Sequence, residues 1–479
     1  MLRNKLSERI AASSLLLVLI VPAFFTALIM GLESAKMRVS ELDYLRAQKA
    51  AADYALTHYD RDLWANFRLW AGREVNDLET VRKILPKLEG LDLAVYSETE
   101  AFSEEDLRAQ ILKQMKERLP LQLMNQLRLR LERFGSHSSS IKAITDSALA
   151  ESSEDSLEEL EFWRAELLGD AGSPDEGGLD DLEDDLDELE DESESESQAE
   201  RRAKKLLAKL FSELDEQKRY LLSNYSAEEL NELPLDSLKG LALIGDMAQS
   251  YADFTAQVGL EKLQLIEYVL AYFPAAVTVQ KTNEQTQDIL RLDGLPHSQL
   301  KAKYPQNYAE MILTGLSDAK AKKRVEYYIL ALRLGAHYAS LNGQPEKKQK
   351  YLTYGTLISG LISIVSLGNI VVPPEGIAQV IIFAKAGRGA RKDLKQLLKG
   401  RAVAFWPQKD LQKFEIYYHD FLRFFFLAKS ESKILEQLAL QLKSLFPQAT
   451  VGAYRIEASF KDYAKSQFIV DYLERKGSE

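Results

Sequence analysis

The hydrophobic pattern of the chain begins with a segment that is apolar on every side. Residues 10–32 (IAASSLLLVLIVPAFFTALIMGL) form a run of 23 positions without a charged side chain. As a helix this run would be about 34 Å long, enough to cross the ~30 Å hydrocarbon core of a bilayer. It is longer than the apolar part of a typical signal peptide, and Glu33 stands in the candidate cleavage site, where a small residue is preferred. The pattern predicts an uncleaved transmembrane anchor; a cleaved signal peptide is the alternative.

The charges beside this segment predict its orientation. Three cations precede it (Arg3, Lys5 and Arg9) and two follow it (Lys36 and Arg38). Loops that remain in the cytoplasm carry the larger number of Lys and Arg residues. We therefore expect residues 1–9 in the cytoplasm and the bulk of the chain on the other side, as in a single-pass protein of a bacterial inner membrane with a periplasmic body.

Beyond the anchor, apolar residues recur every three or four positions. Such a stripe includes Leu42, Leu45, Ala52, Leu56, Tyr59 and Leu63, and Phe67 and Trp70 extend it. This spacing predicts one amphipathic helix that continues from the membrane. A second helix is expected to begin at Ser103, whose hydroxyl can cap the amides near Asp106, and to run to Pro120. Residues 33–150 thus read as a juxtamembrane helical stalk or bundle, with a long coiled coil as the alternative.

Residues 201–479 also read as successive helices. One stripe runs from Leu263 to Phe273, and another runs from Val325 to Ala339 and ends at the turn Asn342-Gly343-Gln344-Pro345. Short helices joined by tight turns predict a C-terminal, helical-repeat-like domain in which each hairpin packs on a neighbour. The fold class predicted for the whole chain is therefore mainly α.

A short run in this domain resembles a known repeat family. The run is Leu334-Gly335-Ala336-His337-Tyr338, followed by Gly343 and Tyr351. Its small and aromatic residues are similar to those of a tetratricopeptide repeat, over about one 34-residue unit. Three positions depart from the family pattern: Ala331 replaces an aromatic residue, Lys347 a small residue and Ser359 the closing proline. The resemblance implies a TPR-like pair of helices.

A second apolar run raises a question of topology. Residues 355–372 (GTLISGLISIVSLGNIVV) contain no charge, and Gly355, Ser359 and Ser363 are spaced so that they share one helix face. Small residues at this spacing allow close helix packing both in soluble cores and in membranes. The run, with the apolar residues that follow it to 384, is expected to be a buried helix of the C-terminal domain, with membrane contact as the alternative.

Composition changes this picture in one region. The 479 residues carry a net charge of −12, are 46% hydrophobic and are 28% charged. Residues 151–200, however, contain 23 acidic residues and one basic residue, so the remainder of the chain is net basic. Such a segment buries too little apolar surface to fold, and we expect an acidic, disordered, low-complexity linker. Four leucines in it are candidate partner contacts, should the segment become helical on a basic surface: Leu179, Leu182, Leu186 and Leu189.

Seven cations cluster between residues 385 and 401. They are Lys385, Arg388, Arg391, Lys392, Lys395, Lys399 and Arg401. Because they follow an apolar run, they are candidate contacts for a membrane or another anionic surface. The acidic tract or a phosphate group could also occupy them, although the order of a P-loop is missing. A simple solvated helix face is the remaining alternative.

No motif in the sequence indicates a reaction. The chain has no cysteine, which excludes disulfides, thiolate metal sites and cysteine catalysis. Its five histidines (His58, His137, His297, His337 and His419) lack metal-binding spacing, and no Gly-x-Ser-x-Gly elbow is present. His419 and Asp420 lie in an aromatic run, but neighbours on a helix point about 100° apart and cooperate poorly. We therefore expect no cofactor, metal, nucleic acid or small-molecule substrate.

These features together favour a membrane-anchored scaffold or adaptor without enzymatic activity. Its extracytoplasmic helical body would contact other proteins of an envelope assembly, and self-association is left open. The alternatives are a sensor or receptor subunit that signals through a membrane partner and an envelope enzyme without a recognisable motif.

Overall fold

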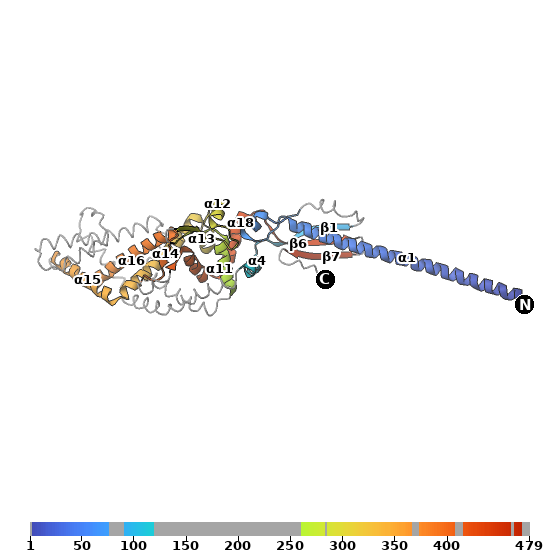
Figure 1. Cartoon of the computed structure of the whole chain (residues 1–479), viewed down its shortest axis with the longest axis horizontal. Coiled ribbons are helices and arrows are strands. Elements are labelled where there is room, and N and C mark those ends of the chain that lie inside the picture. The colour runs from blue at the N-terminus through green and yellow to red at the C-terminus, as the bar shows by residue number, and fades with distance from the viewer. Residues whose placement is uncertain are drawn as a thin grey trace. The chain divides into compact units, whose positions relative to one another are not determined.

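The computed structural model describes residues 2–75, 91–118, 260–282, 285–365, 373–407, 415–460 and 464–471. In these ranges the chain is mainly helical, as predicted (Figure 1). It divides into two compact units, one of Met1–Gln110 with Leu442–Glu479 and the other of Ile111–Gln441. The predicted acidic linker 151–200, its four leucines, residues 119–150 and residues 201–259 lie outside the described residues.

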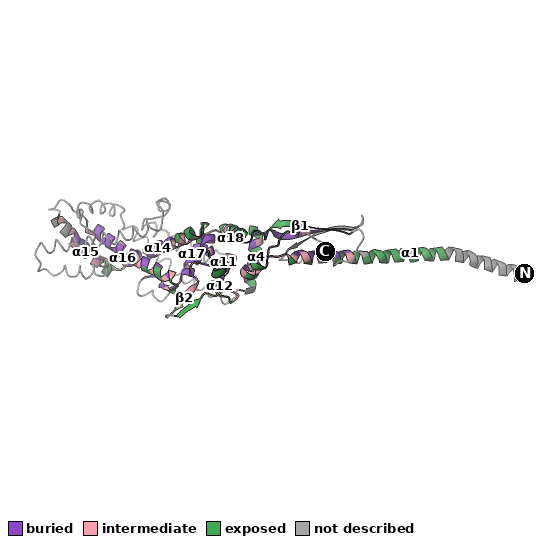
Figure 2. Cartoon of the chain, turned by 90° about the horizontal axis from the view of Figure 1, so that it is seen from above, coloured by how far each residue is buried: buried purple, intermediate pink, exposed green. Residues whose placement is uncertain are grey.

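The first unit begins with a single long helix, α1 (Leu2–Thr57, 56 residues). Among the described helices it is the one that is long and apolar enough to cross a membrane. Its exposed stretch from Ile20 to Val39 extends beyond the part that packs on the unit (Figure 2). Pro22 lies inside α1 without ending it, and the Thr26 hydroxyl donates to the Pro22 carbonyl oxygen at 2.6 Å. The prediction of an N-terminal apolar helix is confirmed.

The second half of α1 packs on a three-stranded antiparallel sheet. The strands are β1 (Leu91–Glu100), β6 (Val451–Phe460) and β7 (Ala464–Asp471), in the order β1-β6-β7. α1 runs alongside them and contacts all three (Figure 1). The sequence prediction lacked this sheet, although residues 91–97 and 451–458 alternate apolar and polar positions in part, as strands do.

The helix face that meets this sheet is not the predicted one. Tyr44, Ala47, Ala51 and Ala55 are buried, and Ala55 packs against Val451 and Tyr454 of β6. Alanines have the small side chains that let a helix lie close to a sheet. The predicted stripe is therefore wrong at its start, because its two leucines at positions 42 and 45 are 55% and 53% exposed.

The predicted continuous helix also ends earlier than expected. α1 stops at Thr57, and Leu63 and Phe67 belong to a separate short helix, α2 (Arg61–Phe67). Asp60 separates the two helices, since its Oδ1 accepts the amide of Leu63 at 3.0 Å and caps α2. Its Oδ2 accepts a hydrogen bond from Arg73 at 3.0 Å, which ties the cap to the following segment.

The predicted second helix is confirmed at its start. α4 (Glu104–Arg118) begins after Ser103, whose Oγ accepts the Asp106 amide at 3.2 Å. In the same unit, the buried Gln110 side chain bonds both backbone groups of Trp70, at 2.7 and 2.9 Å. This pair of hydrogen bonds replaces the partners that the irregular backbone after α2 would otherwise lack.

The second unit consists of helices and two short hairpins. Its helices are α11 (Leu260–Tyr272), α12 (His297–Lys303), α13 (Tyr308–Thr314), α14 (Asp318–Asn342), α15 (Pro345–Val365), α16 (Pro374–Leu398), α17 (Tyr418–Ala428) and most of α18 (Glu431–Leu445). β2 (Val279–Thr282) pairs with β3 (Gln285–Asp288), and β4 (Val403–Ala404) pairs with β5 (Glu415–Ile416). The predicted turn at residues 342–345 separates α14 from α15, where Gly343 caps the first helix.

α16 packs against both α14 and α15. Gly355 of α15 is needed for this contact, because a Cβ atom there would lie 2.2 Å from the Pro374 carbonyl oxygen. From Gly355 to Val365, therefore, the apolar run is part of α15, which packs on α16. The TPR-like residues occupy α14, the turn and α15, and their repeat character stays a prediction.

The two units differ from the domain limits that we expected. Leu442–Glu479 was expected to belong with residues 201–441, but it is grouped with Met1–Gln110. The physical reason is strand pairing, since β6 supplies the hydrogen-bond partners of β1 over nine residue pairs from Leu91↔Phe460 to Glu100↔Val451. The end of the chain thus completes the fold of its beginning.

Candidate functional site

The seven predicted surface cations fall on α16 and just beyond it, and they divide into two groups. Lys392, Lys395, Lys399 and Arg401 are exposed. The three lysines are spaced by three and four positions, so they lie along one side of the helix. We call these four residues the basic stripe. It is the part of the predicted anionic contact that solvent or a partner can reach.

The other three cations are drawn into the unit. Arg391 is buried, with 8% of its surface exposed. Lys385 is half-buried, and its Nζ lies 5.3 Å from the centre of the Tyr351 ring, a cation–π distance. Arg388 is half-buried as well. Gly387 and Gly389 both lie inside α16.

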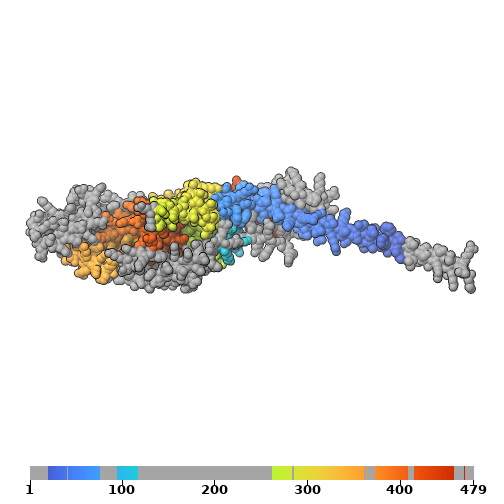
Figure 3. Space-filling view, viewed as in Figure 1, coloured from blue at the N-terminus to red at the C-terminus, as the bar shows by residue number. Residues whose placement is uncertain are grey.

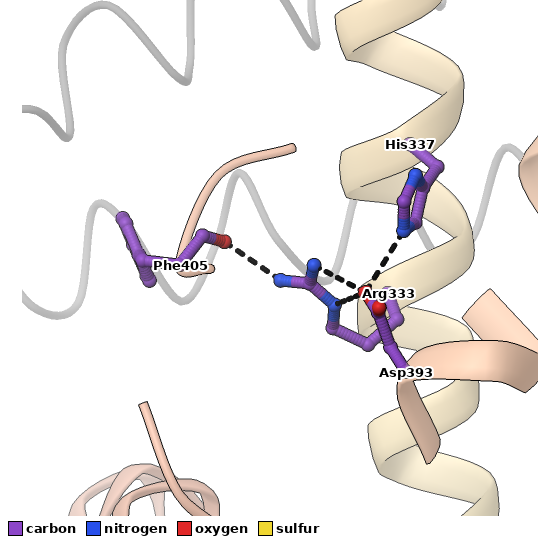
Figure 4. A network of polar contacts seen from close by, with 4 residues as sticks. All are labelled: Arg333, His337, Asp393 and Phe405. Atoms are coloured by element: carbon purple, nitrogen blue, oxygen red, sulfur yellow. Dashed lines mark hydrogen bonds and ion pairs between the residues drawn. The ribbon is translucent and has the colours of Figure 1, made fainter. Parts of the chain in front are cut away.

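A partly buried polar cluster joins α14 to α16 beside this stripe (Figure 4). Arg333 of α14 is 3% exposed, and its Nε donates to Oδ2 of Asp393 on α16 at 2.8 Å. Nη1 of Arg333 donates to the carbonyl oxygen of Phe405, after β4, at 2.7 Å. His337, one turn further along α14, donates from Nε2 to the same Asp393 oxygen at 2.9 Å. The Asp393 carboxylate therefore accepts hydrogen bonds from both Arg333 and His337 of α14.

The electrostatics of the cluster favour a charged carboxylate. Burial by itself would raise the pKa of Asp393, but the hydrogen bond from His337 and the positive charge of Arg333 lower it below its usual value. Burial lowers the pKa of Arg333, against the attraction of Asp393. A guanidinium remains charged even so. Two opposite charges and a ring held this way fasten the two helices and the segment at Phe405 together.

Gly389 makes room for this cluster. A Cβ atom at Gly389 would lie 2.8 Å from both Nδ1 and Cε1 of the His337 ring. The ring thus packs flat against the backbone of α16, which a larger residue would prevent. Gly389 therefore has a packing role.

A second set of polar contacts converges on the first turn of α17. Arg423 donates from Nε to Glu267 of α11 at 2.6 Å and from Nη1 to Asp420 at 2.6 Å. Burial opposes the charge of Arg423, but the two carboxylates outweigh it and raise its pKa. Oδ2 of Asp420 also accepts the Tyr417 amide at 2.9 Å, at the start of α17. Asp420 therefore cooperates with Arg423, and not with its neighbour His419.

Glu310 of α13 is a fully buried carboxyl group. Its Oε1 accepts hydrogen bonds from the Ala276 amide and the Tyr418 hydroxyl, both at 2.8 Å. Burial raises the pKa of Glu310, although these two donors oppose the shift. The same burial, together with the neighbouring carboxyl group, raises the pKa of Tyr418 well above its usual value.

His297 and His419 form a buried pair between α12 and α17. Their ring centres are 6.1 Å apart, and they are 1% and 5% exposed. None of the four ring nitrogens has a hydrogen-bond partner in the part of the chain that the structure describes. Burial, reinforced by nearby Arg291, lowers the pKa of His297 to about 4. Burial, together with His297 and Arg423, lowers the pKa of His419 to about 3. Both rings are therefore neutral at pH 7.

Sequence reasoning missed most of these groups. It noted His337 for its place in the TPR-like run and His419 for its aromatic surroundings, but it did not connect either to its contacts. A signal was present for one cluster, because Arg333 and His337 interrupt an apolar stripe at a spacing of four. No group of three or more His, Cys, Asp or Glu residues among the described positions is arranged to hold a metal ion.

One comparison with known proteins gives a result. Residues 196–437 match the family of unknown function DUF5702. This is just over half of the chain, so the protein belongs to that family. No curated protein and no solved structure is significantly similar to it. The matched residues contain every polar cluster described above, whereas α1 and the sheet lie outside them.

We predict that Gly389→Ala destabilises the second unit by about 1–3 kcal/mol, the usual effect of overpacking. The new methyl group must displace the His337 ring and weaken its bond to Asp393. Gly360→Ala is the matched control, since Gly360 is a helical glycine with nothing within 4 Å of a Cβ atom. It should stabilise α15 by about 0.5–1 kcal/mol. Urea unfolding read by hydrogen-exchange mass spectrometry measures both, and effects of the same sign would contradict the prediction.

We also predict that the second unit loses stability as the pH falls from about 6.5 to 4. Unfolded histidines bind protons near pH 6.5, whereas His297 and His419 resist them down to about pH 4 and 3. The unfolded state therefore takes up protons first, and each ring lowers the unfolding free energy by up to about 1.4 kcal/mol per pH unit.

Urea midpoints between pH 7.5 and 4.5, read on peptides of α17, test this expectation. His297→Gln should reduce the slope of stability against pH, and the double variant with His419→Gln should reduce it further. Ile312→Val is the control: this buried apolar residue of the same unit should lower stability equally at every pH. Wild-type slopes in the histidine variants would show that the rings are not held neutral.

Proposed function

We propose that the protein is a membrane-anchored, non-enzymatic scaffold or adaptor whose helical body contacts other proteins of an envelope assembly. One observation carries the proposal: α1 is a single helix that is apolar and exposed at one end and packed on the sheet at the other. Such a helix attaches a folded body rigidly to a bilayer.

The exposed end of α1 supports the anchor. Phe24, Phe25, Met30 and Leu32 are 62%, 56%, 66% and 63% exposed. Apolar surface costs about 25 cal/mol per Å² in water, so a row of such residues needs a cover, and a bilayer provides one. The unbroken helix also supports retention of the segment, because cleavage near Ala35 would cut within a regular helix whose next turns pack on the sheet.

The basic stripe supports the adaptor role. Two of its four exposed cations, Lys392 and Lys395, lie on α16, which the Arg333–Asp393 pair holds in place, and the other two follow the end of that helix. A fixed row of cations suits an anionic protein surface, and contacts of this kind weaken as salt rises. Anionic lipid and the acidic tract of residues 151–200 are the competing ligands for the stripe.

The proposed location follows from the flanking charges. The N-terminus would lie in the cytoplasm and the bulk of the chain in the periplasm, with one crossing of the inner membrane. In this arrangement both compact units face the same compartment, where they can meet the same partners.

We predict that the wild-type protein stays in the membrane fraction after carbonate extraction, whereas Phe24→Arg with Phe25→Arg is released. Each arginine at the centre of a span costs about 2.5–3.5 kcal/mol by insertion scales. Met37→Arg is the control, because Met37 is equally exposed but lies beyond the apolar segment. Alkaline phosphatase fused after residue 479 should be active. Release of the wild type by carbonate would contradict the proposed anchor. An inactive fusion would contradict its proposed orientation.

For the adaptor role, we predict that reversing the stripe charges removes specific partners. Lys392→Glu, Lys395→Glu and Lys399→Glu together should reduce, by at least tenfold, the envelope proteins recovered after crosslinking in cells. Three exposed but scattered lysines, Lys320, Lys347 and Lys433, changed to Glu give the same charge difference and should preserve recovery. Equal recovery with both triple variants would contradict an adaptor surface on α16.

A further inference from the structure

An apolar ridge continues along α1 past the end of the membrane segment. It consists of Leu28, Leu32, Ala35, Val39 and Leu42, which are spaced by four, three, four and three residues. All five are exposed, the four larger ones by 45%, 63%, 58% and 55% in chain order. A 4-3-4-3 spacing is that of the a and d positions of a coiled coil.

The ridge lies on the side of α1 that faces away from the sheet. At about 100° per residue, Ala35, Val39 and Leu42 fall within roughly 60° of one another on the helix. The buried positions Tyr44, Ala47 and Ala51 are centred on the opposite side. In the space-filling view this part of α1 is a narrow rod (Figure 3). The contact with the sheet therefore leaves the ridge accessible.

A bilayer does not suit the outer half of this ridge. Glu33, Lys36, Arg38 and Glu41 surround α1 at the same level as Val39 and Leu42, and all four are exposed. Charged side chains at this density belong in water or headgroups, not in hydrocarbon. Val39 and Leu42 therefore need an apolar cover made of protein.

We propose that this cover is the same ridge of a second copy, so that two α1 helices pair in parallel just outside the membrane. The inference rests on the proposed anchor, because a shared bilayer gives both copies the same orientation. A symmetric pair needs a self-complementary surface, and an apolar a/d ridge meets that requirement.

The charges beside the ridge fit this parallel pairing. With Leu32 and Val39 at a and Ala35 and Leu42 at d, Arg38 occupies a g position and Asp43 the following e position. In parallel coiled coils the g residue of one helix faces the next e residue of the other. Arg38 of each copy therefore lies opposite Asp43 of the other copy. The pair has two such contacts, and each joins a positive to a negative side chain.

The same heptad also limits the length of the contact. The next a and d positions are Arg46 and Lys49, both exposed cations that repel their counterparts. The pairing thus ends where the packing of α1 on the sheet begins. A coiled coil this short is weak by itself. It depends on the membrane, which confines both copies to one plane and raises their effective concentration.

Disulfide trapping in native membranes tests the proposal directly, because the wild-type chain has no cysteine. A disulfide needs Cα atoms within about 7 Å, so crosslinking reports true contact. Leu42→Cys and Val39→Cys should form dimers under mild oxidation at least tenfold faster than Met37→Cys. Met37 is the matched control, since it is 63% exposed but lies on the other side of the helix. Equal rates at all three positions would overturn the proposal.

A charge swap tests the register. In the Leu42→Cys background, Arg38→Asp or Asp43→Arg alone should slow crosslinking severalfold, and the two together should restore it. Independent effects of the two changes would overturn the parallel register. Carbonate extraction of the same samples separates the two proposals: membrane-bound protein without ridge-specific crosslinks refutes pairing alone, whereas released protein refutes the anchor as well.

Discussion

The contact between the alanine face of α1 and its sheet is the constraint on which the first unit depends. Ala47, Ala51 and Ala55 have no exposed surface, and Ala55 packs directly against β6. This contact fixes the rotation of the helix about its axis. It therefore also determines which residues of the exposed half face outward, since a regular helix carries its rotation along its whole length.

The second unit is stabilised by a different kind of interaction. Its helices are joined through partly buried charge pairs, in which the buried Arg333 binds Asp393 and the buried Glu267 binds Arg423, which also binds Asp420. Buried pairs of this kind add little net stability, but loss of one partner leaves a charge without compensation. They suit a body that keeps one arrangement of helices and presents a fixed surface. The residues that match the family contain these pairs.

Sequence could predict the features that depend on neighbours in the chain. The apolar end of α1, the Ser103 cap and the turn at Gly343 are all encoded within a few residues. The sheet was not predicted because β1 and β6 are separated by more than 300 residues. A local sequence pattern does not indicate which distant strand a segment pairs with. The same holds for Asp393, which lies 60 positions from Arg333. For α1, the sequence pattern put Leu42 and Leu45 on the apolar face. The position of the sheet shows that alanines occupy the buried face and that these leucines are exposed.

Because α1 is one continuous helix, insertions or deletions within it change the rotation of its exposed half relative to the sheet. Inserting one residue between Leu32 and Tyr44 would turn everything before it by about 100° relative to the sheet, and three or four residues would come close to a full turn. Seven residues would restore the rotation to within about 20°. Relatives with a longer or shorter segment between Leu32 and Tyr44 are therefore expected to differ by whole turns. With the proposed anchor, the distance from the membrane to the sheet would then change in steps of about 5 Å.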